Sequence, residues 1–98
     1  MTVYIAQVQT RTTGYGQSAE TRLILGAFAS YQTARTACMA ELDTFMQEND
    51  IAPSLSTVRQ YEESFECFCE FHGQACLCSF FATEVQGSTD KVGGITRL

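Results

Sequence analysis

The sequence predicts an α+β domain in which a four-stranded, mainly antiparallel sheet carries one helix across one face. Two stretches with the alternation of strands lie on each side of one stretch with the apolar periodicity of a helix. Each pair of strands can close as a hairpin, which gives the order ββαββ. Because 98 residues can build one core and not two, we expect a single domain at residues 1–86 and a flexible tail at 87–98.

Residues 2–10 and 21–29 form the first predicted pair of strands. Both stretches alternate loosely and contain β-branched residues, which favour the extended backbone of a sheet. Residues 11–20 are polar and contain Gly14-Tyr15-Gly16. This composition predicts a long, mobile hairpin loop between the two strands.

The helix is predicted for residues 31–48 and begins after Ser30, whose hydroxyl can accept a hydrogen bond from a free amide of the first turn. Its apolar side chains fall within an arc of roughly 80°, which is the width of a stripe that packs on a sheet. These side chains are Tyr31, Ala34, Cys38, Leu42 and Phe45. Asn49, Asp50 and Pro53 end the helix, and residues 49–56 lead to the next strand.

The most informative stretch is a predicted hairpin of residues 57–71 and 74–85, whose first strand is broken or bulged near Glu62-Glu63. A two-residue loop at His72-Gly73 would join the strands. Because side chains alternate between the two faces of a strand, this register gathers six of them on one face. They form the opposed pairs Cys69 and Cys76, Cys67 and Cys78, and Phe65 and Phe80.

The opposite face of this hairpin is also apolar, because Phe68 and Leu77 oppose each other there, with Glu66 and Glu70 beside them. In one interpretation the acidic residues are the solvated edge of a strand, which discourages aggregation. In the other they surround an apolar centre that binds a protein partner. The residues predicted to bind this partner are Glu62, Glu63, Glu66, Phe68, Glu70, Leu77 and Phe81.

The hairpin cysteines allow three interpretations. They can be small hydrophobic residues beneath the helix, since free cysteine is among the most buried residue types. Alternatively, Cys67, Cys69, Cys76 and Cys78 bind a metal ion, although their one-residue spacing on a flat hairpin suits tetrahedral zinc poorly. Cross-strand disulfides are the third possibility, which the geometry permits and a reducing compartment opposes. The sequence favours the first interpretation, so we expect thiols without a metal or other cofactor.

The charge of the chain restricts its partners. A net charge of -5 and a pI near 4.6 argue against affinity for nucleic acid or an anionic membrane, because phosphate binders need a cationic surface. Between positions 41 and 70 many acidic residues accompany one basic residue, Arg59, which suits a partner with a basic surface. No apolar run approaches the ~20 residues that span a bilayer. With no export signal at Met1, a cytoplasmic location is expected.

The end of the second strand, Gly26-Ala27-Phe28-Ala29-Ser30, leads directly into a helix that contains Ala34 and Ala37. This arrangement resembles a pattern in small phage, plasmid and bacterial accessory proteins, where a strand ending in glycine, a small residue, an aromatic residue and serine precedes an alanine-rich helix. The size and acidity are similar to those of phage-encoded inhibitors of bacterial defence, including anti-CRISPR proteins. The resemblance implies such a lineage in a bacterial host cell and brings no functional residues with it.

The sequence contains no convincing catalytic site. His72, the single histidine, belongs to the predicted turn, and Gly14-Tyr15-Gly16 lacks the lysine and third glycine of a phosphate-binding loop. We therefore expect a non-enzymatic acidic protein-binding module. From the resemblance, it would be a phage inhibitor that covers a basic surface on a CRISPR-Cas-like, nucleic-acid-handling host protein. The alternatives are a small cysteine-based metal or redox module and a homodimer that buries the second sheet face against itself.

Overall fold

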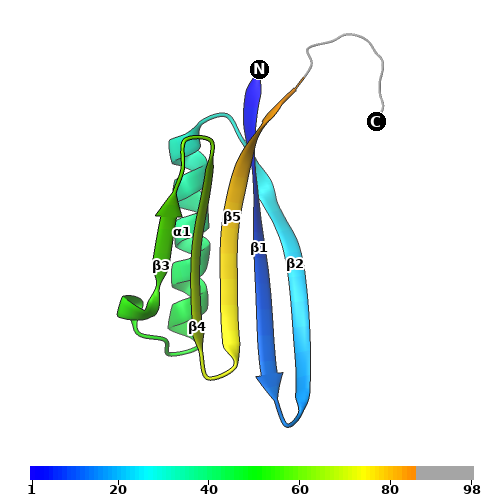
Figure 1. The fold of residues 1–98 in the computed structure, drawn as a ribbon, viewed down its shortest axis with the longest axis vertical. Helices are drawn as coiled ribbons and strands as arrows, with labels where there is room; N and C mark the ends of the chain where they lie inside the picture. Colours follow the sequence, from blue (N-terminus) through cyan, green and yellow to red (C-terminus); the bar gives the residue numbers. More distant parts are fainter. Residues whose placement is uncertain (86–98) are drawn as a thin grey trace.

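The computed structural model describes residues 1–85 as a five-stranded antiparallel sheet with one α-helix (Figure 1). The elements are β1 (Thr2–Gly14), β2 (Gln17–Phe28), α1 (Tyr31–Glu48), the 3-10 helix η1 (Pro53–Leu55), β3 (Thr57–Gln60), β4 (Ser64–Phe71) and β5 (Gln74–Glu84). The strands are ordered β2-β1-β5-β4-β3 across the sheet. The predicted α+β class is confirmed, but the structure has five strands where the sequence predicted four in the order ββαββ.

The additional strand results from a chain reversal within the predicted third strand, residues 57–71. The amide of Tyr61 donates a hydrogen bond of 3.0 Å to the carbonyl of Ser64, which leaves Glu62 and Glu63 as a two-residue turn. β3 and β4 then pair as antiparallel neighbours. A break near these two glutamates was expected, but the chain turns back on itself there instead of continuing along one strand.

The polar residues 11–20 do not form the expected loop, because β1 and β2 extend through them as a long hairpin. Tyr15 and Gly16 make its two-residue turn, with φ angles of 52° and 76°. Two-residue turns with positive φ match the twist of the paired strands. In Figure 1 the tip of this hairpin projects beyond the end of the hairpin formed by β4 and β5.

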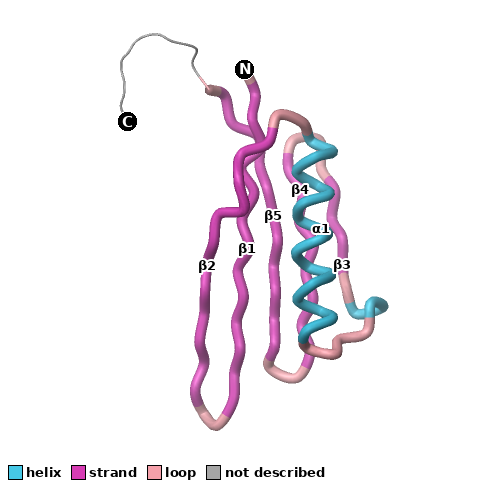
Figure 2. Tube along the Cα trace, turned by 180° about the vertical axis from the view of Figure 1, so that it is seen from behind, coloured by secondary structure: helices cyan, strands magenta, loops and turns pink. Residues whose placement is uncertain are grey.

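Helix α1 lies along one face of the sheet, where it contacts β5, β1, β4 and β2 (Figure 2). It begins as predicted, because the Ser30 side chain accepts a hydrogen bond from the amide of Thr33. Its buried stripe consists of Ala34, Cys38, Leu42 and Met46. Phe45 was predicted to be in this stripe and is half-buried at its margin. The helix is therefore rotated slightly from the predicted orientation, and Met46 is buried in place of Phe45.

The core lies between α1 and the three central strands. The buried residues of the sheet are Ala6, Val8, Phe65, Cys67, Cys69, Cys76, Cys78 and Phe80. The Phe65 and Phe80 rings stack with their centroids 5.4 Å apart, and the Tyr31 ring meets Phe80 edge-on at 4.8 Å. The Tyr31 hydroxyl also donates to the Tyr61 carbonyl over 2.8 Å, which connects the start of α1 to the turn between β3 and β4.

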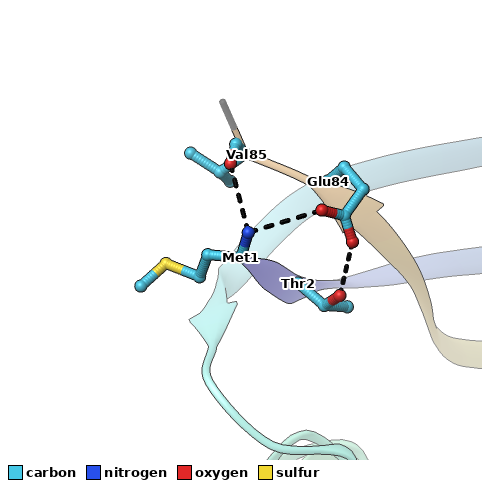
Figure 3. A network of polar contacts seen from close by, with 4 residues as sticks. All are labelled: Met1, Thr2, Glu84 and Val85. Atoms are coloured by element: carbon cyan, nitrogen blue, oxygen red, sulfur yellow. Dashed lines mark hydrogen bonds and ion pairs between the residues drawn. The ribbon is translucent and has the colours of Figure 1, made fainter. Parts of the chain in front are cut away.

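The first and last described residues lie side by side (Figure 3). The amide of Val85 donates to the carbonyl of Met1 over 2.8 Å, and the Met1 amino group lies 3.4 Å from a carboxylate oxygen of Glu84. A hydrogen bond from the Thr2 hydroxyl, followed by the nearby amino group, lowers the pKa of Glu84. The predicted domain limit at residue 86 and the predicted tail at 87–98 lie outside the described residues.

Candidate functional site

The hairpin of β4 and β5 divides its side chains between two environments. Its register is the predicted one, with Cys69 opposite Cys76 and Phe68 opposite Leu77. The two cysteines are buried on the side of the sheet that packs against α1. Because side chains alternate along a strand, Phe68 and Leu77 face away from the helix. We call this side of the sheet, opposite α1, the outer face.

A groove of about 630 Å³ crosses the outer face, which is a volume typical of ligand-binding sites. Residues from all five strands line it, so positions far apart in the sequence meet there. Its apolar lining includes Phe68, Ala75 and Leu77, all of them half-buried. Its charged lining consists of three arginines and three glutamates: Arg11, Arg22, Arg59, Glu20, Glu66 and Glu70.

Two ion pairs span neighbouring parts of the groove. Arg59 on β3 lies 3.2 Å from Glu66 on β4, and Arg11 on β1 lies 3.1 Å from Glu70 on β4. The strand between β1 and β4 places Ala75 opposite both Arg11 and Glu70, and this small side chain lets the longer ones meet above it. Exposed pairs of this kind are worth about 0 to 1 kcal/mol each, so their main effect is to fix the position of the charges.

Arg59 also lies over the aromatic ring of Phe68, with its guanidinium carbon 5.2 Å from the ring centroid. This is the geometry of a cation–π contact. The surroundings of Phe68 therefore differ from an apolar centre with a purely acidic rim, which was one of the two interpretations of the sequence. Glu66 and Glu70 are present, but each is paired with an arginine, and the charged lining of the groove is balanced.

Glu20 and Arg22 differ from the other charged residues of the groove. Among residues 1–85, the ion pairs involve neither of them. Both are exposed on β2, which is an end strand of the sheet. Since they are two positions apart on one strand, their side chains share a face.

The seven residues predicted to bind a partner fall in two places. Glu66, Phe68, Glu70 and Leu77 line the groove together. Phe81 is 51% exposed further along β5, and Glu62 and Glu63 are exposed in the nearby turn before β4. Sequence reasoning missed the charged and polar residues that the first hairpin and β3 contribute to the groove. These are Gln9, Thr10, Arg11, Glu20, Thr21, Arg22 and Arg59.

All five cysteines are free thiols and are buried. Burial, followed by the neighbouring Cys67, raises the pKa of Cys38 to about 12, and burial also raises the pKa of Cys69. Hydrogen bonds that Cys78 shares with the sulfurs of Cys67 and Cys76 raise its pKa and lower theirs. Within residues 1–85, no three His, Cys, Asp or Glu side chains are placed to hold a metal ion.

His72 occupies the exposed turn between β4 and β5, as predicted. Its ring centroid lies 4.0 Å from that of Phe71. A nucleophilic pair needs an accessible thiol within hydrogen-bond reach of the imidazole. The thiols are instead buried under α1, so the described part of the chain does not present such a pair to solvent.

No protein-family model, curated protein or solved structure matches this chain significantly. Along residues 1–85, no helix combines the length and the apolar character that crossing a membrane requires.

Proposed function

We propose that this chain is a non-enzymatic protein-binding module that contacts its partner through the outer face. The proposal is supported mainly by one observation: α1 covers only one face of the sheet, and the other face has a groove lined by half-buried Phe68 and Leu77. An apolar centre among polar groups is the usual composition of a protein interface. Full burial of a large apolar side chain is worth about 1.5 to 3 kcal/mol. A partner that covers Phe68 and Leu77 would therefore gain binding free energy.

The charges indicate how this partner is recognised. The groove carries equal numbers of arginines and glutamates, so the segment that enters it must offer charges of both signs around apolar groups. Unbalanced negative charge lies outside the groove, where Asp43, Asp50, Glu62 and Glu63 are exposed. Such a surplus attracts a basic protein from a distance and speeds its association.

The proposed partner is therefore a protein with a basic surface, such as one that handles nucleic acid. By covering that surface, the module would compete with the phosphates that the partner normally binds. Inhibition is the expected consequence, because the two ligands cannot occupy the same surface.

Phe68→Asp tests this proposal, because it introduces a charge into the apolar part of the groove. Gln32→Asp is the matched control, since it adds the same charge on the exposed side of α1. We expect immobilised wild-type protein and the control to retain the same protein from a bacterial lysate, and Phe68→Asp to lose it. With the purified partner, the affinity of Phe68→Asp should fall by about 2 kcal/mol or more, as for a central interface residue. Equal affinity of the two folded variants would contradict the proposal.

A further inference from the structure

The β2 edge of the sheet offers a surface of a different kind. Within residues 1–85, β2 pairs only with β1; it has 12 residues and contains neither the proline nor the lysine that often protect edge strands. It exposes Leu23 by 62% and Ile24 by 60%, and the register with β1 puts these two side chains on opposite faces. The pairing with β1 is regular from Gln17 to Ile24 and shifts only beyond that point. This stretch can therefore accept a further strand.

The register of the first hairpin shows which backbone groups are available. Gly14 and Gln17 flank a two-residue turn and are opposite each other, so they form a hydrogen-bonded pair. Hydrogen-bonded and non-hydrogen-bonded pairs then alternate along the two strands. It follows that every second residue of β2 directs its N–H and C=O groups away from the sheet. These residues are Ser18, Glu20, Arg22 and Ile24.

The charges along this edge are self-complementary, so two copies of β2 can pair with opposite charges facing each other. Glu20 and Arg22 flank Thr21 and form no ion pair among residues 1–85. If two copies of β2 pair antiparallel about a two-fold axis at Thr21, each Glu20 lies opposite an Arg22 of the other copy. Opposite charges in directly facing positions stabilise a strand pair, whereas like charges destabilise it. A two-fold axis at Glu20 or at Arg22 would bring like charges together, so the charges select the register centred on Thr21.

We propose that β2 is a homodimerisation edge, where two copies of the chain pair antiparallel about Thr21 through two Glu20–Arg22 ion pairs. The two sheets then form one continuous sheet of twice the width, with both outer faces on the same side. Leu23 of each copy faces Ala19 of the other. Because Glu20 and Arg22 also line the groove, the two grooves adjoin across the axis. This inference concerns the edge of the sheet and does not depend on the proposed function of its outer face.

Charge reversal tests the ion pairs. Glu20→Arg and Arg22→Glu each create two like-charge contacts per dimer, so the dimer dissociation constant from sedimentation equilibrium should rise about tenfold or more. The double variant Glu20→Arg with Arg22→Glu restores opposite charges and should return to within about threefold of the wild type. Glu48→Arg, at an exposed position of α1, changes the net charge by the same amount as Glu20→Arg and should leave the constant unchanged. A monomeric wild type, or a double variant as weak as the singles, would overturn the proposal.

An engineered cysteine tests the register. At a two-fold axis on Thr21, the two Cα atoms form a non-hydrogen-bonded pair about 4.5 Å apart, which a disulfide can bridge. Thr21→Cys should therefore form a covalent dimer under mild oxidation, whereas the native cysteines are buried. Ala19→Cys is the control on the same side of β2 and should not crosslink, because it faces Leu23 of the other copy. Crosslinking of Ala19→Cys but not Thr21→Cys would exclude this register.

A dimer that is lost in Phe68→Asp but not in Glu20→Arg would place the contact between the two copies on the outer face instead of the β2 edge.

Discussion

At the scale of single residues, cysteine fills the contact between helix and sheet. All five cysteines are buried, four of them on β4 and β5 and the fifth, Cys38, on the facing side of α1. Free cysteine behaves as a small hydrophobic residue, and here it lets the helix approach the sheet closely. At Cys38, burial disfavours the charged thiolate, so this part of the core should lose stability at alkaline pH.

Cys38 should give the fold a measurable loss of stability in alkali. Its folded pKa is raised to about 12, mainly by burial, from an ordinary value of 9.0. Below about pH 9 the thiol is neutral in both states, and as pH rises toward 12 only the unfolded chain ionises, so the free energy of unfolding falls by about 1.4 kcal/mol per pH unit. Cys38→Ala lacks this dependence. In urea titrations, the stability advantage of the wild type over Cys38→Ala should shrink by about 1.4 kcal/mol between about pH 7 and about pH 10. An advantage that stays constant would show that the thiol is not protected by folding.

The pairing of residues on the second hairpin could be predicted because it depends on local pattern. Alternation around His72-Gly73 was sufficient to place Cys69 opposite Cys76, as observed. The arginines of the groove could not be found in this way. Arg11 meets Glu70 across 59 positions of sequence, and the contact depends on β1 lying beside β5, which no local pattern specifies.

At the scale of elements, three two-residue turns determine the sheet, and they differ in how clearly the sequence marks them. His72-Gly73 separates two alternating strands and was predicted. Tyr15-Gly16 lies in a polar stretch that has the composition of a loop. The predicted strands on both sides of it were therefore shorter than the observed ones. Glu62-Glu63 contains no typical turn residue, which is why the reversal that creates β3 was predicted only as a break.

Gly73 should be the less replaceable of the two turn glycines. Both Gly73 and Gly16 have positive φ, 81° and 76°, and alanine in this region costs about 1 to 2 kcal/mol at either position. A Cβ on Gly73 would in addition lie 2.9 Å from the carbonyl oxygen of Thr13, whereas one on Gly16 meets nothing within 4 Å. The Gly73 carbonyl also accepts a hydrogen bond of 2.9 Å from the amide of Thr13.

We therefore expect Gly73→Ala to lose about 1 kcal/mol more stability than Gly16→Ala in chemical unfolding, because the second hairpin must move away from β1. Equal losses would mean that the contact between residue 73 and the Thr13 carbonyl relaxes without a loss of stability.

Across residues 1–85 as a whole, α1 covers one face of the sheet, the outer face carries a charge-balanced groove, and β2 forms one edge with no described strand beyond it. The two proposals for these surfaces can fail separately. Phe68→Asp changes the outer face without changing the edge, and Glu20→Arg reverses the charge pattern of the edge while leaving Phe68 and Leu77 in place.

The hairpin of β4 and β5 buries its cysteine side and presents its Phe68 and Leu77 side to solvent. Thiol labelling tests this arrangement, because the chain supplies five native cysteines as an internal control. In native wild-type protein none of them should react rapidly, since all five are buried, and all should react after denaturation. Leu77→Cys, between Cys76 and Cys78 on the opposite face, should add one thiol that reacts in the native state. Rapid native labelling of the wild type, or an unreactive Leu77→Cys, would contradict the assignment of the two faces.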